Sequence, residues 1–202
     1  MTDTFPLESR GLTSDELKRI ETDTLELLTG MIGKLSQEDW RQGLAWYHDA
    51  HSMALEWSAN SGLPFDYVAG IMAALSPRVS WANNVQDTAN VIGHGHKGKT
   101  MALLANVNKA LDIREGYDPD EILGGRKVRS FWLNIAYPHK SLDVTLDSHM
   151  AKVVGLPSVK WLERKGVYDA LANAFRTLAE KHGIMPHQLQ AALWIQARGN
   201  AN

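Results

Sequence analysis

The sequence predicts an all-α protein. Apolar residues recur at helical spacing along most of the chain, and the breaks between these segments fall at glycine, proline and asparagine. No run of alternating polar and apolar residues is bounded by turn residues on both sides, so the pattern does not favour a sheet. The chain has 202 residues, a length that one compact unit can accommodate. We therefore expect about nine or ten short helices.

Two helices are predicted in the N-terminal part. The first begins near Ser14, carries leucine and isoleucine at helical spacing, and ends at Gly30. The second begins after Ser36, where acidic residues favour the first turn, and continues to the Asn60–Gly62 break. We assign residues 1–62 to N-terminal helices that pack on the core, and residues 63–202 to a second region.

Two further helices and a loop follow. Pro64 suits the first turn of a short buried helix over 65–75, which ends before Pro77. Ser80 is expected to cap the next helix, and the apolar spacing predicts an inner face made of Trp81, Val85, Ala89 and Ile92. The glycines and histidines of residues 93–99 predict a mobile loop.

The C-terminal half continues the helical pattern. A pair of glycines, Gly124 and Gly125, separates a single helical turn from the next helix, and residues 142–146 are too short to be more than an extended connector. The expected helical segments are 101–113, 118–120, 126–136, 147–154, 168–181 and 185–197.

The composition excludes several classes of site. The chain has no cysteine, which rules out disulfides, cysteine-ligated zinc, a cysteine-ligated iron–sulfur cluster and a thiol nucleophile. Residues 1–10 do not resemble a signal peptide, and the most apolar stretch is too short to span a bilayer. We expect a cytoplasmic protein with no membrane contact.

The charge is unevenly distributed. The formal net charge is −2, from 21 basic and 23 acidic side chains. Residues 97–165 nevertheless hold 12 basic and 8 acidic side chains. This local surplus predicts an anionic ligand on one face, although chance clustering of solvated side chains gives the same count.

The segment from Ile122 to Gly155 contains the pattern most suggestive of chemistry. Gly124 and Gly125 allow a sharp turn with exposed N–H groups, which together with the start of the next helix favour phosphate binding. Basic residues follow at once, and Asp147 begins another helix after a loop.

Two stretches of this segment resemble the helix-hairpin-helix DNA glycosylase superfamily, the endonuclease III-like group. They are Gly125–Arg126–Lys127 and the run VTLDSHMAKV at 144–153. The runs IMAALSP at 71–77 and NNV at 83–85 are similar to the family's helix pair beside the DNA. The resemblance covers residues 65–198. It implies a two-lobed helical bundle that binds double-stranded DNA and flips a base out of the duplex.

The chain also departs from the family pattern. The hairpin is two residues shorter than usual, Pro77 stands where a pocket glutamine is expected, and the absence of cysteine excludes the iron–sulfur cluster of many members. These departures are typical of a divergent branch, similar to phage-encoded relatives related to thymine hypermodification. A phage-encoded protein would act in the host cytoplasm.

The resemblance implies roles for individual residues. Asp147 would be the catalytic carboxylate that stabilises positive charge at C1′, and an aspartate there also suits a helix N-cap. Lys127 would form a Schiff base with the deoxyribose or contact a phosphate. Trp81 would line the base pocket or pack in the core. The expected DNA-binding residues are Gly124, Gly125, Arg126, Arg129, Ser76, Asn83 and Asn84.

The remaining polar residues point to no cofactor and no metal. His94 and His96 lack a third ligand nearby, and the helical spacing directs His149 away from Asp147. The polar and aromatic residues of the last helix are interpreted as structural; they are Gln188, Gln190 and Trp194.

We therefore expect a DNA glycosylase that cleaves the N-glycosidic bond of a damaged or modified base. Two alternatives remain open. One is a transferase or pyrophosphorylase-like enzyme that acts on 5-hydroxymethyl pyrimidines in phage DNA, and the other is a non-catalytic DNA-binding or host-interacting protein. The sequence predicts neither the base nor the oligomeric state.

Overall fold

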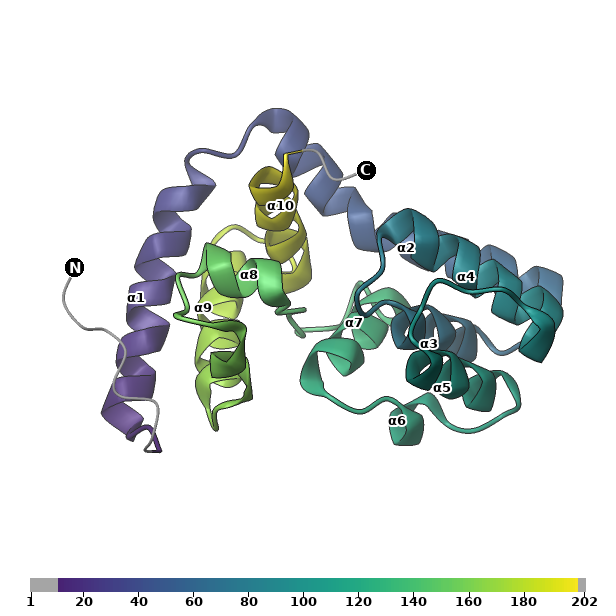
Figure 1. The fold of residues 1–202 in the computed structure, drawn as a ribbon. Helices are drawn as coiled ribbons and strands as arrows, with labels where there is room; N and C mark the ends of the chain where they lie inside the picture. The colour runs from purple at the N-terminus through teal and green to yellow at the C-terminus, as the bar shows by residue number, and fades with distance from the viewer. Residues whose placement is uncertain (1–10, 200–202) are drawn as a thin grey trace. The chain divides into compact units, whose positions relative to one another are not determined.

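The computed structural model describes residues 11–199, and within them every regular element is a helix (Figure 1). The predicted all-α class is therefore confirmed. The elements are α1 (Ser14–Ile32), α2 (Gln37–Ser61), α3 (Phe65–Leu75), α4 (Trp81–His94), the 3₁₀ helix η1 (Gly95–Lys97), α5 (Leu104–Arg114), α6 (Pro119–Ile122), α7 (Arg126–Ala136), α8 (Ser148–Val153), the 3₁₀ helix η2 (Val159–Glu163), α9 (Val167–Lys181) and α10 (Pro186–Arg198).

The chain folds into two compact units. Unit 1 contains the described residues up to Trp46 together with those from Leu142 onward, and unit 2 contains Tyr47–Ser141. The long helix α2 contributes its first turns to unit 1 and the rest to unit 2. The boundary that we placed between residues 62 and 63 falls within unit 2, between α2 and α3.

Unit 1 is built around α9. Helix α1, purple in Figure 1, packs along α9, and α10 packs on α9 as well. Phe175 and Leu171 of α9 are fully buried, and the alanines between them allow close helix packing. Gly43 of α2 lies directly against Ala192 of α10, where a Cβ on the glycine would stand 2.5 Å from the alanine backbone.

Unit 2 is built around α3. All residues of α3 from Val68 to Leu75 are buried, and α4, α5, α6 and α7 pack against the helix. A helix that is apolar all round belongs in the centre of a bundle, because every face needs a partner. Gly70 permits the approach of Pro119 of α6, whose ring atoms lie 2.9 Å from the position of a Cβ at residue 70.

The buried face of α4 differs from the predicted one. The apolar residues Trp81, Val85, Ala89 and Ile92 are only half-buried. The buried line consists instead of Asn84, Asp87, Thr88 and Val91.

Specific hydrogen bonds explain this polar buried face. Asp87 is 1% exposed, and its carboxylate accepts hydrogen bonds from the backbone N–H groups of Met101 and Ala102 at 2.9–3.0 Å. The Thr88 hydroxyl donates to the Asn84 carbonyl at 2.7 Å. Apolar periodicity identified the wrong face because the Asp87 carboxylate and the Thr88 hydroxyl find hydrogen-bond partners inside the unit.

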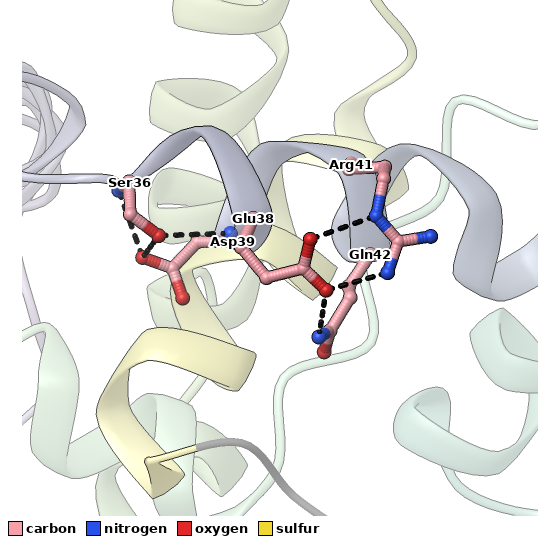
Figure 2. A network of polar contacts seen from close by, with 5 residues as sticks. All are labelled: Ser36, Glu38, Asp39, Arg41 and Gln42. Carbon is pink, nitrogen blue, oxygen red and sulfur yellow. Dashed lines mark hydrogen bonds and ion pairs between the residues drawn. The ribbon is translucent and has the colours of Figure 1, made fainter.

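The start of α2 is fixed by an exposed polar network (Figure 2). The Ser36 hydroxyl accepts from the Asp39 N–H at 3.0 Å, and the Asp39 carboxylate accepts from the Ser36 N–H at 2.8 Å. In the same first turn, Glu38 accepts from the Arg41 Nε at 2.8 Å and from Gln42. The hydrogen bond from Arg41, followed by that from Gln42, lowers the pKa of Glu38 from 4.5 to about 2.

Most predicted element boundaries agree with the structure, with three adjustments. The first helix continues past Gly30 to Ile32, α4 extends to His94, and α5 begins at Leu104. Among the described residues, no helix is both long enough and apolar enough to cross a membrane.

Candidate functional site

The predicted phosphate-binding turn connects α6 and α7 in unit 2. Gly125 has φ +81°, a conformation that residues with a Cβ rarely adopt, and nothing lies within 4 Å of the position where a Cβ would stand. Gly125 is also the N-cap of α7 and provides no side-chain hydrogen bond to the first turn. The side-chain capping that would compete with an anion at this helix start is therefore absent.

Basic side chains surround this turn. Arg126 is exposed and Lys127 is half-buried in the first turn of α7. Lys109 of α5 is a residue that the sequence analysis missed; its Nζ lies 3.8 Å from the position of a Cβ on Gly124. Lys109 lies 15 positions before Gly124 in the sequence, so no short sequence pattern indicates that the two are close in space. Together these residues give the turn the positive charge that a phosphate requires.

The Arg129 side chain bonds to Asp120 on the other side of the glycine turn. Its guanidinium donates to the Asp120 backbone carbonyl at 2.8 Å and also pairs with the Asp120 carboxylate. This fork joins α6 to α7 across the two glycines. The predicted phosphate contact of Arg129 would have to share the guanidinium with Asp120.

The α3–α4 connection contains the other predicted DNA-binding residues. The Ser76 hydroxyl donates to the Ala73 carbonyl at 2.9 Å, and Asn83 is exposed in the first turn of α4. Asn84 is 1% exposed, and its amide donates to the Met72 carbonyl at 2.9 Å, which holds α4 to α3. The Asn84 side chain therefore connects α4 to α3, and its contact with DNA stays a prediction.

Trp81, the predicted base-pocket residue, is half-buried at the first residue of α4, a position that fits both readings of its role. The same connection holds Arg78, an exposed arginine with φ +66°. Among the described residues it is the one non-glycine with positive φ.

Asp147 lies at the N-cap of α8 in unit 1, as predicted. One carboxylate oxygen accepts from the Met150 N–H at 2.8 Å, and the other from the Trp194 indole N–H at 3.3 Å. The Arg198 guanidinium lies over the Trp194 ring, 4.7 Å from its centroid. Trp194 was interpreted as structural. It lies 47 positions after Asp147, so no local sequence pattern could have revealed this contact.

The segment before Asp147 is anchored by a buried tyrosine. The Tyr168 hydroxyl of α9 donates to the Val144 carbonyl at 2.7 Å and accepts from the Leu146 N–H at 3.1 Å. Val144 and Leu146 are each 1% exposed, so the extended connector is packed in the core. The half-buried Asp147 thus follows an anchored connector and caps the helix after it. Each carboxylate oxygen accepts one hydrogen bond and retains a lone pair for a ligand.

The predicted catalytic residues belong to different units. Asp147 is part of unit 1, whereas Lys127 and the glycine turn are part of unit 2. His149 is exposed on α8, and the hydrogen-bonding partner of Asp147 on α10 is Trp194. The last helix also buries Gln190, while Gln188 donates to the Leu44 carbonyl at 3.1 Å.

The histidine-rich segment makes hydrogen bonds to its surroundings. His96 Nε2 lies 2.7 Å from a Glu115 carboxylate oxygen, and Asn90 donates to the Lys99 carbonyl at 2.7 Å. The predicted loop over 93–99 is partly helical, because α4 continues to His94 and Gly95–Lys97 form η1; its mobility stays a prediction. Within residues 11–199, no group of three or more histidine, aspartate or glutamate side chains is placed to hold a metal ion.

Comparisons with known proteins identify a family but no activity. No curated protein matches the chain, and no solved structure matches it either. Residues 21–201 match the model described as "Family of unknown function (DUF7178)". Because this match covers most of the sequence, the chain belongs to that family.

Proposed function

We propose that the protein is a DNA-acting enzyme that flips a base out of the duplex and cleaves its N-glycosidic bond. The proposal includes a fold of the two-lobed helix-hairpin-helix glycosylase type. Its main support is the orientation of Asp147, whose carboxylate is held by one backbone and one indole N–H group at a helix start. The sequence around this residue resembles the catalytic segment of that superfamily.

The proposed chemistry uses Asp147 to stabilise charge. As the bond from C1′ to the base breaks, the sugar becomes positively charged, and a fixed carboxylate lowers the energy of that state. The same group can instead orient the attacking water. A carboxylate whose position is set by Trp194 and Met150 loses little orientational freedom during the reaction.

The proposed contact with DNA uses the α6–α7 turn. The first-turn N–H groups of α7 would donate hydrogen bonds to a backbone phosphate, and Arg126 and Lys109 would add positive charge. Such contacts position a protein on the duplex without reading its sequence. Lys127, in the same turn, would contact a phosphate or form a Schiff base with the deoxyribose.

Asp147→Asn tests the chemistry. Asparagine caps helices about as well as aspartate, so the fold should persist while the charge is lost. We would incubate the protein with duplexes that contain damaged, hydroxymethylated or pyrophosphorylated bases and analyse free bases and nucleosides by mass spectrometry. Wild-type protein should release a base and Asp147→Asn should release about a hundredfold less. Asp15→Asn, an exposed first-turn aspartate of α1, is the matched control.

Other products would favour other functions. A mass gain on the nucleoside would support the base-modifying transferase, and binding without any product would support the non-catalytic DNA-binding protein. Full turnover by Asp147→Asn would refute the catalytic role of this residue. Failure of borohydride to trap an active enzyme on DNA would exclude the Schiff base at Lys127.

Lys109→Gln tests the DNA contact separately. Anisotropy titrations of a labelled duplex at several salt concentrations should show weaker binding and a salt slope reduced by about 0.9 for one lost phosphate contact. Lys18→Gln, on the exposed side of α1, should leave both quantities unchanged. Equal effects of the two substitutions would contradict the assignment of the turn.

A further inference from the structure

The chain passes between the two units at two places. One lies between Trp46 and Tyr47 within α2, and the other between Ser141 and Leu142. We call them the α2 crossing and the 141 crossing. Unit 2 therefore begins at the α2 crossing and ends at the 141 crossing.

Both crossings are anchored on α7. The Tyr47 ring, 2% exposed, meets the Phe131 ring edge-on with centroids 6.0 Å apart. At the other crossing the buried Ser141 hydroxyl donates to the Asn134 amide oxygen at 2.6 Å. Helix α7 is thus the common support of the two connections on the unit 2 side.

A pair of histidines joins the crossings directly. His48 follows the α2 crossing by one residue and His139 precedes the 141 crossing by two. Their rings lie with centroids 4.7 Å apart and planes inclined at 40°. One turn further along α2, His51 Nδ1 lies 2.8 Å from the Ile135 carbonyl oxygen, where a ring N–H can donate.

The surroundings of His48 disfavour its positive charge. Partial burial lowers its pKa from 6.5, and the charges of His139 and His51 lower it further, while Asp49 has the opposite effect. Lys140, next to His139 in the chain and exposed, contributes another positive charge to this segment. Two protonated imidazoles at this separation repel each other, so the contact is stable with at least one ring neutral.

Two further titratable groups in this region, Tyr137 and Asp66, pair with each other. The Tyr137 hydroxyl donates to the Asp66 carboxylate at 2.9 Å. Histidine is the residue type whose ordinary pKa lies near neutral pH, and three histidines lie here: the ring pair His48 and His139, and His51 one turn along α2.

We propose that His48 and His139 form a pH-operated clasp. It fastens the 141 crossing to α2 at neutral pH and releases it when both rings are protonated. The free energy that the clasp contributes is present above the ordinary histidine pKa and is lost as the pH falls below it. The inference does not depend on the proposed function.

Hydrogen exchange of residues 137–141 tests the clasp. The Lys140 and Ser141 amides donate to the Tyr137 carbonyl at 3.0 and 2.8 Å, so their protection reports whether the segment is closed. Protection factors would be measured at about pH 7.5 and about pH 5.5, on either side of the histidine range. They should fall on acidification, by up to about tenfold for each pKa unit by which closure lowers the histidine.

Two substitutions distinguish the clasp from a general effect of acid. His48→Gln should abolish the pH dependence of protection, because glutamine does not titrate. His94→Gln, at an exposed position of the same unit, should keep the wild-type response. Equal protection at the two pH values in the wild type, or an unchanged fall in His48→Gln, would overturn the proposal.

Nuclear magnetic resonance of the wild-type chain gives a readout that needs no variant. The His48 ring signal should titrate below the ordinary histidine pKa of 6.5, and the amide shifts of residues 137–141 should change with the same midpoint. A midpoint for these amides that differs from those of both His48 and His139 would also overturn the proposal.

Discussion

Gly43→Ala should destabilise unit 1 through a single close contact. The added Cβ would stand 2.5 Å from the Cα, Cβ and backbone N of Ala192. Overpacking of a helix contact costs about 1–3 kcal/mol. Backbone atoms of α10 cannot rotate away, so we expect the upper part of that range. The better helix propensity of alanine offsets about 1 kcal/mol. The net loss in unfolding free energy is therefore about 1–2 kcal/mol.

The assay is urea denaturation followed by circular dichroism, with Gly30→Ala as the matched control. Gly30 lies in α1, and nothing lies within 4 Å of its Cβ position. This control should be as stable as the wild type or more stable by up to about 1 kcal/mol. Ala192→Gly combined with Gly43→Ala should recover only part of the loss, because two of the three close atoms are backbone. A Gly43→Ala protein as stable as the control would refute the packing argument.

Three further outcomes follow from individual contacts. Asp87→Asn should lower the unfolding free energy by about 1–3 kcal/mol, because the amide group cannot accept all the backbone N–H groups that the buried carboxylate accepts. Tyr168→Phe should cost a similar amount, about 1–3 kcal/mol, since two buried backbone groups of the connector lose their partner. Arg41→Gln should raise the pKa of Glu38 from about 2 towards 4.5, as measured by carboxyl resonance titration.

The controls for these outcomes are specific. Urea denaturation of Asp120→Asn, at an exposed carboxylate, should show a smaller loss than Asp87→Asn. A Tyr168→Phe protein with wild-type stability would contradict the anchoring of the connector. For Glu38 the sign is fixed: its pairing stabilises the fold above about pH 4.5 and is lost as the pH falls towards 2. An unchanged titration in Arg41→Gln would show that another group lowers the pKa.

The local elements could be predicted because their signals are local. The bounds of α3 and α7 agree with the prediction, since Pro64 and Gly125 mark the starts and Pro77 and Pro138 limit the ends. The buried face of α4 could not be predicted from apolar spacing. Its burial depends on partners for Asp87 that lie on the following loop, and such pairing overrides hydrophobicity.

The same distinction applies to the candidate site. Asp147 as a helix cap and the turn at Gly125 follow from short patterns, and the structure places both as expected. The residues that contact Asp147 and the glycine turn could not be predicted from such patterns. Trp194 reaches Asp147 from another helix, and Lys109 approaches the glycine turn from α5. Contacts of this kind depend on how the helices pack, which short patterns in a single sequence do not reveal.

The arrangement of the units has a consequence for the order of folding during synthesis. Unit 2 is a continuous stretch, so its helices can pack as soon as the chain up to Ser141 has left the ribosome. Unit 1 cannot fold at that stage, because α1 packs on α9, which is synthesised much later. At ~5–20 residues per second, α1 waits on the order of ten seconds for its partner. During that interval the apolar side of α1 lacks the partner that covers it in the folded chain.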